Sequence, residues 1–276
     1  MSIDYRIFTD QIRRGLLHGV LLVLLAILSC VVHALDGDTC KSVVVSADPE
    51  FPPFAWYDGK QLHGASVNVV TEVLDAMRLP YEVRYVGPFL RLLQSAEFGT
   101  VDIIAELKDT PGRREFLQFV PTPIFPNPTS VFVKSTSGLR YRSREDLKGH
   151  SGGVTHGTRF GGGFDEYLSA ELSIESAPGI KENFGKLAAE RIEYFVSPYY
   201  PAMSYLAPAG KEAEFVALKP NVAQVDNFVG WSKKSLCLSR LAEFDAVLAK
   251  RVRSGVTQQR IDEAMKAWRR APTMSR

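Results

Sequence analysis

The chain has 276 residues, of which 45% are hydrophobic and 23% are charged, a composition typical of a globular protein large enough for two lobes. Its formal net charge is only +2, so nothing in the charge points to a nucleic-acid partner or to an anionic membrane surface.

The first segment differs from the rest of the chain. Arg13 and Arg14 precede an apolar run over residues 15–32, and Val32-His33-Ala34 closes it with small residues. A basic start, an apolar middle and a small-residue exit are typical of an export signal, so we predict a signal peptide at 1–34. An uncleaved membrane anchor and lipidation at Cys30 are the alternatives, and only in those cases do we expect membrane attachment.

Two cysteines follow the signal, Cys40 and Cys237. An oxidising compartment permits a disulfide between them, which requires both ends of the exported chain to share one lobe. Two buried free thiols are the alternative.

Strand and helix patterns alternate over the first part of the exported chain. We expect strands at 42–47, 81–86 and 101–105, separated by helices at 66–78 and 89–98. This β-α-β-α-β order predicts a parallel sheet with helices on its faces.

The next stretch carries a transition between two units. Residues 107–128 contain five prolines and resemble a loop, and 130–134 is expected to be a strand leading out of the first unit. Two segments are expected to cross between the units, near Lys134 and near Asn227.

A second unit is expected to follow. It would contain a helical turn at 146–149, strands at 152–155 and 192–197, and helices at 164–172 and 181–190. A strand at 225–231 could lead back to the first unit. Helices at 241–253 and 257–269 would return to the first unit. We therefore predict an α/β fold of two doubly wound lobes with a central cleft, the first lobe formed by 35–133 and 229–276 and the second by the inserted 134–228.

Several chemistries are missing from the sequence. The three histidines after residue 40 show no metal-ligand spacing, and two cysteines cannot build a zinc cluster. The glycine-rich stretch 157–163 lacks the lysine of a phosphate-binding loop, and no nucleophile motif appears. We expect no metal and no cofactor, and a binding function in preference to an enzymatic one.

A series of motifs points to a known family. The run SADPEFPPF at 46–54, then Gly64, VDIIA at 101–105 and TPGR at 110–113 resembles the family 3 extracellular solute-binding proteins. DLKG at 146–149 and RIEYFV at 191–196 continue the likeness, which covers nearly the whole exported chain. It implies a type II periplasmic-binding-protein fold, a periplasmic location, a monomer, a small-molecule ligand and, for some members, an ABC permease as partner.

The resemblance also implies roles for individual residues. Arg113 matches the arginine that grips a ligand carboxylate, and a guanidinium can form two parallel bonds to one carboxylate. Thr158 matches a hydroxyl donor from the second lobe. Asp48 matches a position that reaches polar or cationic parts of a ligand. The positions that match aromatic walls are Phe51, Phe54 and Phe89.

Each role has a structural alternative. Arg113 can be a solvated loop charge, Thr158 a helix N-cap and Asp48 a turn-capping residue. Core packing is the alternative for the three aromatic residues, and we expect it for Phe54. Trp56 and Tyr57 are expected on an outer loop.

Two positions depart from the family pattern. Amino-acid receptors of this family place a carboxylate after the strand corresponding to 192–197, where it takes the ligand ammonium; here Pro198 stands there. Asn68 stands where aspartate is common. Glu106 and Asp109, expected on the loop that carries Arg113, are candidates to replace the missing carboxylate.

Tyr199 is expected to add ligand contacts together with Tyr200, unless the two form a surface turn.

We expect a receptor that captures a small polar solute bearing a carboxylate, such as an amino acid or an organic acid, by closing its lobes. One alternative is an enzyme on the same fold, similar to cyclohexadienyl dehydratase, with Glu106 or Asp109 as general acid or base. Another is a ligand-sensing module held at the membrane.

Overall fold

The computed structural model describes residues 40–270. The predicted signal peptide and Cys30 lie outside the described residues. From Lys41 onward the chain forms one compact unit by its internal contacts.

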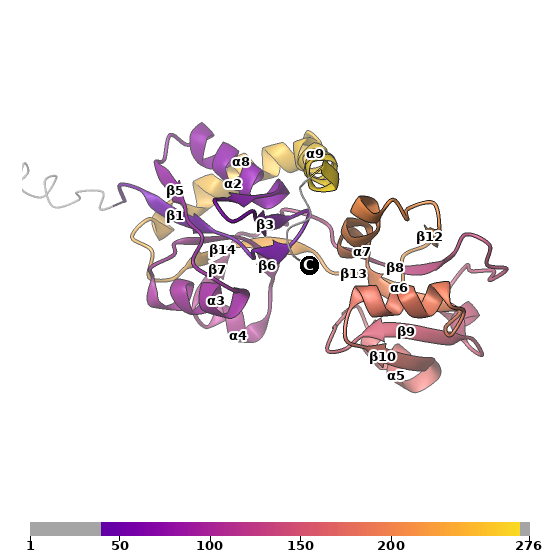
Figure 1. The fold of residues 1–276 in the computed structure, drawn as a ribbon. Coiled ribbons are helices and arrows are strands. Elements are labelled where there is room, and N and C mark those ends of the chain that lie inside the picture. Colours follow the sequence, from indigo (N-terminus) through magenta and orange to yellow (C-terminus); the bar gives the residue numbers. More distant parts are fainter. Residues whose placement is uncertain (1–39, 271–276) are drawn as a thin grey trace, which may run out of the picture. The chain divides into compact units, whose positions relative to one another are not determined.

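One sheet is built from the start of this unit and a returning strand, in the order β5-β1-β6-β14-β7 (Figure 1). β1 pairs in parallel with β5 and β6, which confirms the predicted parallel sheet, and β14 lies antiparallel between β6 and β7. The strands are β1 (Val43–Ser46), β5 (Tyr81–Val83), β6 (Ile103–Lys108), β7 (Leu117–Phe119) and β14 (Asn227–Ser232).

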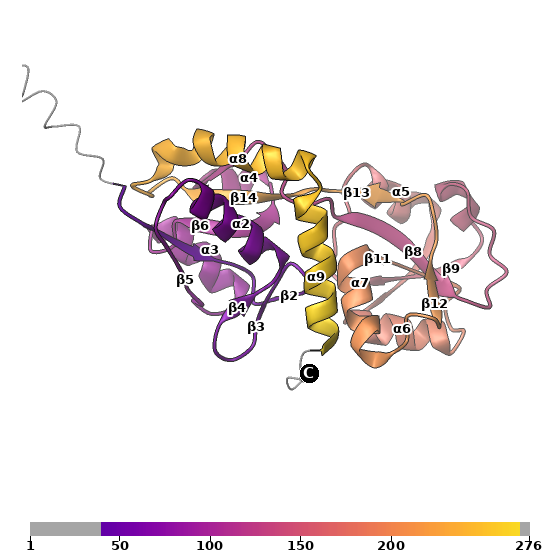
Figure 2. The same ribbon diagram turned by 90° about the horizontal axis from the view of Figure 1, so that it is seen from above.

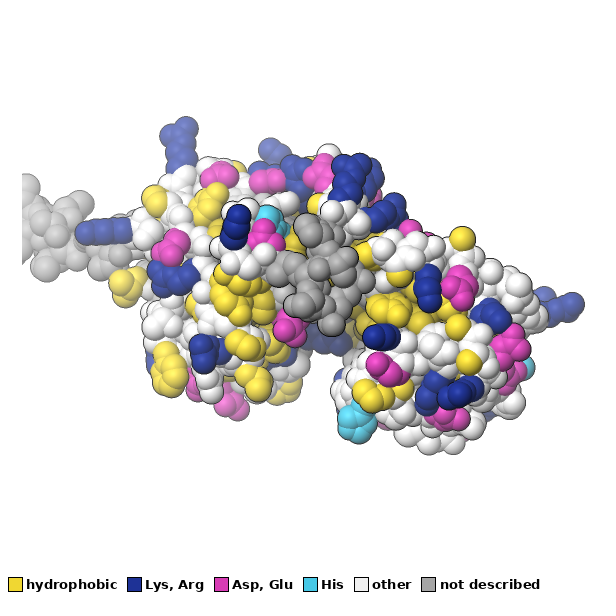
Figure 3. All heavy atoms as spheres, in the orientation of Figure 1, with side chains coloured by type: hydrophobic (Ala, Val, Ile, Leu, Met, Phe, Trp, Pro, Cys, Tyr) yellow, Lys and Arg dark blue, Asp and Glu magenta, His cyan; other side chains and the backbone are white. Residues whose placement is uncertain are grey.

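Helices cover both faces of this first sheet. Figure 1 shows α2 (Ala65–Ala76) and α8 (Leu241–Arg253) on one face and α3 (Phe89–Phe98) on the other. α3 buries Leu92 and Ala96 against the sheet and ends at Gly99 in the left-handed conformation. Its outer face stays open: Leu90 and Phe98 are exposed, and hydrophobic side chains gather over this region in Figure 3.

The stretch expected to be one long loop, 107–128, is partly regular, so that prediction was wrong. β6 continues to Lys108 because its ladder with β14 pairs Lys108 with Asn227. The short helix α4 (Pro111–Arg114) and β7 follow.

A small three-stranded sheet follows β1, made of β2 (Glu50–Phe51), β3 (Ala55–Tyr57) and β4 (Leu62–His63). The expected outer-loop position of Trp56 is wrong: it lies in β3, is 7% exposed and contacts the Trp268 ring at 5.4 Å. The Tyr57 ring stacks on Tyr85 at 3.9 Å. Ring burial therefore fixes this segment against its neighbours.

A second sheet has the order β10-β9-β11-β8-β12, with β13 paired to β8. β9 is parallel to β10 and β11, whereas β8 is antiparallel to its partners. The strands are β8 (Pro128–Lys134), β9 (Ser151–Thr155), β10 (Ser173–Ala177), β11 (Tyr194–Pro198), β12 (Phe215–Ala217) and β13 (Ala223–Gln224).

Side chains that alternate along β8 and β11 contribute to two hydrophobic clusters, one on each face of the second sheet. Val131, Val133 and Val196 face a cluster with Phe164 of α5 (Phe164–Glu171). Phe132 and Phe195 face the opposite cluster, with α6 (Ile180–Ala188) and α7 (Tyr199–Leu206). The period of two along a strand therefore lets one sheet bury both faces.

One expectation about this second part was wrong, and one alternative does not hold. The strand expected at 130–134 belongs to the second sheet, so the chain passes between sheets before Pro128 and Lys134 lies at the far end of β8. The surface turn considered for Tyr199 and Tyr200 is the first turn of α7. The limits given for the two lobes stay a prediction.

The C-terminal helix α9 (Val256–Arg270) lies beside α2 and α7 (Figure 2). On the α2 side, Glu72 accepts hydrogen bonds from Arg251 at 2.7 Å and Arg260 at 2.6 Å. On the α7 side, the Trp268 indole donates to the Ser204 carbonyl at 2.8 Å. α9 therefore ties helices of the first sheet to those of the second.

The two cysteines of the described residues, Cys40 and Cys237, are both disulfide-bonded. Within residues 40–270, none of the helices combines the length and apolar character needed to cross a membrane.

Candidate ligand-binding site

A cavity of about 150 Å³ lies at the carboxyl ends of β1 and β6. Open α/β sheets bind their ligands at this edge, because the loops that follow parallel strands converge there. The residues that line it are Asp48, Phe51, Phe89, Glu106, Leu107, Lys108, Arg113 and Asn227.

Each lining residue is placed by a strand end. Asp48 follows β1, and Phe89 opens α3 after β5. Glu106 lies in the last half of β6, and Arg113 lies in α4 just beyond it. Asn227 begins β14 directly opposite Lys108. The sheet register therefore brings residues that are as far apart in the sequence as Asp48 and Asn227 to one cavity.

The aromatic loop after β1 is held in place by the buried Phe54. Phe54 is completely buried, and its ring lies 5.3 Å from Phe51 and 5.2 Å from Phe125. Its carbonyl accepts a hydrogen bond from the Ser66 hydroxyl at 2.8 Å. Gly64 is required beside it, because a Cβ at position 64 would lie 2.1 Å from that carbonyl oxygen. Phe54 thus supports the wall that Phe51 presents to the cavity.

Arg113 is a half-buried cation in the lining of the cavity. Its Nη1 donates to the Lys108 carbonyl at 2.7 Å, and its guanidinium carbon lies 5.2 Å from the centre of the Phe89 ring. It forms no salt bridge with any residue of the described range. Burial lowers the pKa of Arg113, while Glu106 and Asp48 raise it. The guanidinium therefore keeps hydrogen-bonding capacity for a ligand.

Two carboxyl groups face the same space. Glu106 is 2% exposed, and burial, followed by the nearby Asp48, raises its pKa well above the ordinary carboxyl value. Burial also raises the pKa of Asp48, although its Oδ1 accepts a hydrogen bond from the Glu50 amide at 3.0 Å. That bond is the turn contact considered for Asp48, and the side chain still lines the cavity. The expected loop position of Glu106 was wrong, because β6 extends past it.

Lys108 connects the cavity to the second part of the chain. Its Nζ donates to the Arg159 carbonyl at 2.9 Å, next to Thr158. Burial lowers the pKa of Lys108. The loop that carries Thr158 therefore lies at the mouth of the cavity, although the Thr158 side chain is not part of the lining. Thr158 is also not a helix N-cap, because Gly163 holds that position for α5.

Other sequence candidates lie elsewhere. Tyr199 opens α7, where its ring stacks on Phe132 at 6.4 Å, outside the lining. Asp109 accepts a hydrogen bond from Arg114, with Nε to Oδ1 at 2.6 Å, and does not line this cavity. Asn68 is exposed on α2.

The sequence interpretation missed Leu107, Lys108 and Asn227 as lining residues. Asn227 was recognised only as a crossing point, yet it is 1% exposed and its Nδ2 has no hydrogen-bond partner within residues 40–270. A buried asparagine at the start of a strand was the signal that could have identified it.

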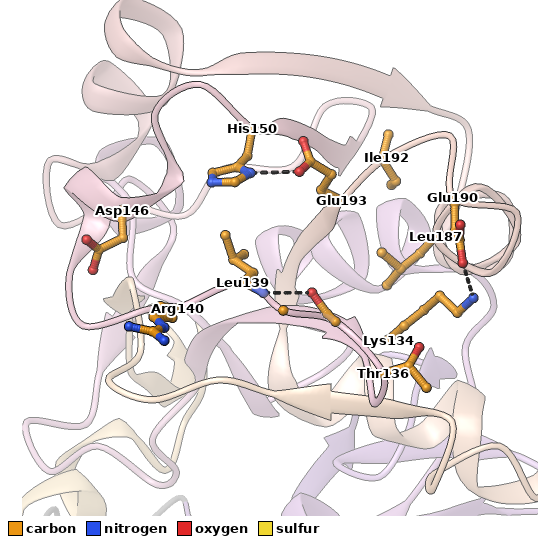
Figure 4. Close-up of a pocket in the computed structure, with 12 residues that line it drawn as sticks. Lys134, Thr136, Leu139, Arg140, Asp146, His150, Leu187, Glu190, Ile192 and Glu193 are labelled. Atoms are coloured by element: carbon orange, nitrogen blue, oxygen red, sulfur yellow. Dashed lines mark hydrogen bonds and ion pairs between the residues drawn. The ribbon is translucent and has the colours of Figure 1, made fainter.

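A second hollow in the described residues, of about 760 Å³, is larger than this cavity. Figure 4 shows its side chains, which include His150 paired with Glu193 at 2.7 Å and Lys134 paired with Glu190 at 2.6 Å. It lies at the amino ends of β9 and β11, away from the edge where parallel strands present ligand loops. Since four of its charged or titratable groups already form the pairs Lys134–Glu190 and His150–Glu193, we take the smaller cavity as the candidate site.

Comparisons with known proteins agree with this geometry. The second substrate-binding domain of GlnP from Lactococcus lactis, in an open conformation, has a TM-score of 0.65 and 19% identity, covering 83% of this chain and 97% of that one. AbpA from Streptococcus pneumoniae, an amino acid ABC transporter substrate-binding protein bound to L-arginine, has a TM-score of 0.58 and 21% identity, covering 83% and 96%. None of the curated proteins matches.

These likenesses establish the α/β fold of type II periplasmic binding proteins. The model of one sequence family matches residues 43–276, nearly all of the chain after the first segment. The chain belongs to the bacterial extracellular solute-binding proteins, family 3.

Proposed function

We propose that this chain is an exported receptor that binds a small solute carrying a carboxylate, and that it delivers the solute to an ABC permease. The observation that carries the proposal is Arg113, a half-buried guanidinium without a salt bridge in the described range, facing a cavity walled by Phe51 and Phe89. A charge-assisted pair of hydrogen bonds to a carboxylate is the interaction that such a group provides.

The aromatic walls support the same function. Phe51 rests on the buried Phe54, and the ring of Phe89 is covered by the Arg113 guanidinium. Rings that are already fixed lose little conformational entropy when a ligand arrives, so more of the contact energy appears as affinity.

Closure of the two sheets on the ligand is part of the proposal. The contact between Lys108 and the Arg159 carbonyl keeps the loop of Thr158 near the cavity mouth. A small rotation about the segments before Pro128 and Asn227 would then bring the Thr158 hydroxyl to the ligand, opposite Arg113.

The test is mass spectrometry of small molecules that co-purify with the exported protein, followed by thermal-shift assays of each. We expect a small carboxylic acid or amino acid that raises the unfolding temperature of the wild type. A co-purifying and stabilising molecule without any anionic group would contradict the proposal.

A second candidate is an enzyme on this fold, favoured by one observation. Glu106 is a buried carboxyl whose raised pKa lies in the direction suited to a general acid, and it faces the same cavity as Arg113. Incubation with cyclic carboxylic acids that can dehydrate separates the two functions. A ligand recovered unchanged supports the receptor, whereas a product formed by the wild type and not by Glu106→Gln supports the enzyme.

A further inference from the structure

Glu106 is a buried carboxyl residue whose side chain has no hydrogen-bond partner in the part of the chain that the structure describes. It is 2% exposed and lines the cavity, yet no side chain or backbone group of residues 40–270 donates a hydrogen bond to its carboxyl. Buried carboxylates in proteins are normally satisfied by several donors. The Glu106 carboxyl has no internal donor in the described range and opens onto the cavity, so a ligand group placed there can supply its donors.

The charges around Glu106 come from three elements. Asp48 after β1 raises its pKa, and Arg113 of α4 lowers it. Lys108, on β6 itself, lines the same cavity, but its Nζ is bound to the Arg159 carbonyl. Arg113 is the cation that acts on the Glu106 carboxyl, and its effect is smaller than those of burial and of Asp48.

The groups of the cavity therefore favour the neutral acid at Glu106. Moving a carboxylate into a low-dielectric space without donors costs several kcal/mol, and a neighbouring carboxylate adds to the cost. The raised pKa of Glu106 follows from these two causes, burial first and Asp48 second.

We propose that Glu106 recognises an ammonium group of the solute, and that each solute bound releases one proton from Glu106. The inference rests on the proposed function and narrows its ligand class to amino acids or related zwitterions, with the carboxylate on Arg113 and the ammonium on Glu106. In this role Glu106 takes the place of the carboxylate that amino-acid receptors of the family carry at the position of Pro198.

The proton balance of the step is simple. At a pH below the raised pKa of Glu106, the carboxyl of the ligand-free protein holds a proton on one oxygen. A ligand ammonium donates hydrogen bonds to both oxygens, so the O–H proton leaves to the solvent and no covalent bond to the ligand forms. Neutral Glu106 and a cationic ammonium become a carboxylate–ammonium pair, and the proton is taken up by buffer.

One competing role has a distinct signature. A neutral Glu106 can instead donate its proton as a hydrogen bond to a ligand carboxylate. The side-chain amide of a Glu106→Gln variant also donates at that position, so this role survives the substitution. The ammonium role does not, because an amide cannot carry the negative charge.

The first experiment uses the ligand-free protein. Infrared difference spectra between wild type and Glu106→Gln, recorded across pH, follow the protonated carboxyl of Glu106. We expect its band to persist well above the pH at which exposed carboxyls ionise. If the Glu106 carboxyl ionises in the same pH range as the exposed carboxyls, the inference is overturned, while the proposed receptor function is unaffected.

The second experiment is calorimetry with the common L-amino acids and, for each binder, the matching acid that lacks the α-amino group. At a pH where the infrared band is present, the binding enthalpy should vary with the ionisation enthalpy of the buffer, with a slope of about one proton per ligand. Glu106→Gln should abolish the slope and weaken binding roughly 10- to 100-fold, the loss expected for a charge-assisted bond. Asp109→Asn is the matched control, because Asp109 pairs with Arg114 outside this cavity.

The outcomes distinguish a failure of the ammonium role of Glu106 from a failure of the proposed receptor function. A slope of zero, unchanged affinity in Glu106→Gln, or binding only of acids without an amine overturns the inference and leaves the receptor. No binding of acids or amino acids by the wild type overturns both.

Discussion

Replacing Arg113 with alanine tests the anion-binding role directly. The guanidinium is half-buried over the Phe89 ring and, within residues 40–270, makes one hydrogen bond, to the Lys108 carbonyl. A lost charge-assisted hydrogen bond costs about 1.5–3 kcal/mol. Since about 1.4 kcal/mol is tenfold in affinity, Arg113→Ala should weaken binding of a carboxylate ligand by roughly 10- to 150-fold.

The assay is isothermal titration calorimetry with the co-purified ligand, alongside thermal unfolding of each variant. Arg114→Ala is the matched control, because the Arg114 side chain is exposed, pairs with Asp109 and does not line the cavity. Arg113→Lys should fall between wild type and alanine, because an ammonium keeps the charge and loses the planar fork. Unchanged affinity in Arg113→Ala, or an equal loss in Arg114→Ala, would refute the reasoning.

Three further changes probe the structure around the site. The raised pKa of Glu106 stabilises the fold at low pH, and this contribution is lost as pH rises from the ordinary carboxyl range toward the pKa of Glu106. Denaturant unfolding of ligand-free Glu106→Gln should therefore show a stability advantage over wild type that grows with pH. A difference that stays constant across pH would contradict the burial argument. Gly64→Ala places a Cβ 2.1 Å from the Phe54 carbonyl oxygen and should cost roughly 2 kcal/mol or more of unfolding free energy, so a wild-type midpoint would count against that contact. Trp268→Phe removes the indole hydrogen bond from α9 to the Ser204 carbonyl and should lower the unfolding free energy by about 1 kcal/mol, whereas equal or greater stability would mean that α9 does not tie the two parts together.

The longer helices could be predicted from the sequence because their apolar spacing is local information. Residues 89–98 and 241–253 form helices with the predicted limits. The short strands β10 and β12 were missed, since Ser173–Ala177 carries mostly exposed residues and owes its structure to pairing with β9.

Some residues of the cavity could likewise be predicted from local sequence, whereas others depend on strand pairing. Asp48, Phe51, Phe89 and Arg113 follow strand ends, so a parallel sheet already predicts that they converge. Glu106 was assigned to a loop because its charge ends an apolar run. Its place inside β6, and that of Lys108 and Asn227, depend on a ladder between segments more than a hundred residues apart in the chain.

A crystal structure of the protein purified with its own ligand tests the central claim most directly. We expect the solute between the Phe51 and Phe89 rings, with its carboxylate on the Arg113 guanidinium and the Thr158 hydroxyl within hydrogen-bonding distance. A solute bound in the hollow around His150 and Lys134, with none in the Arg113 cavity, would contradict the account.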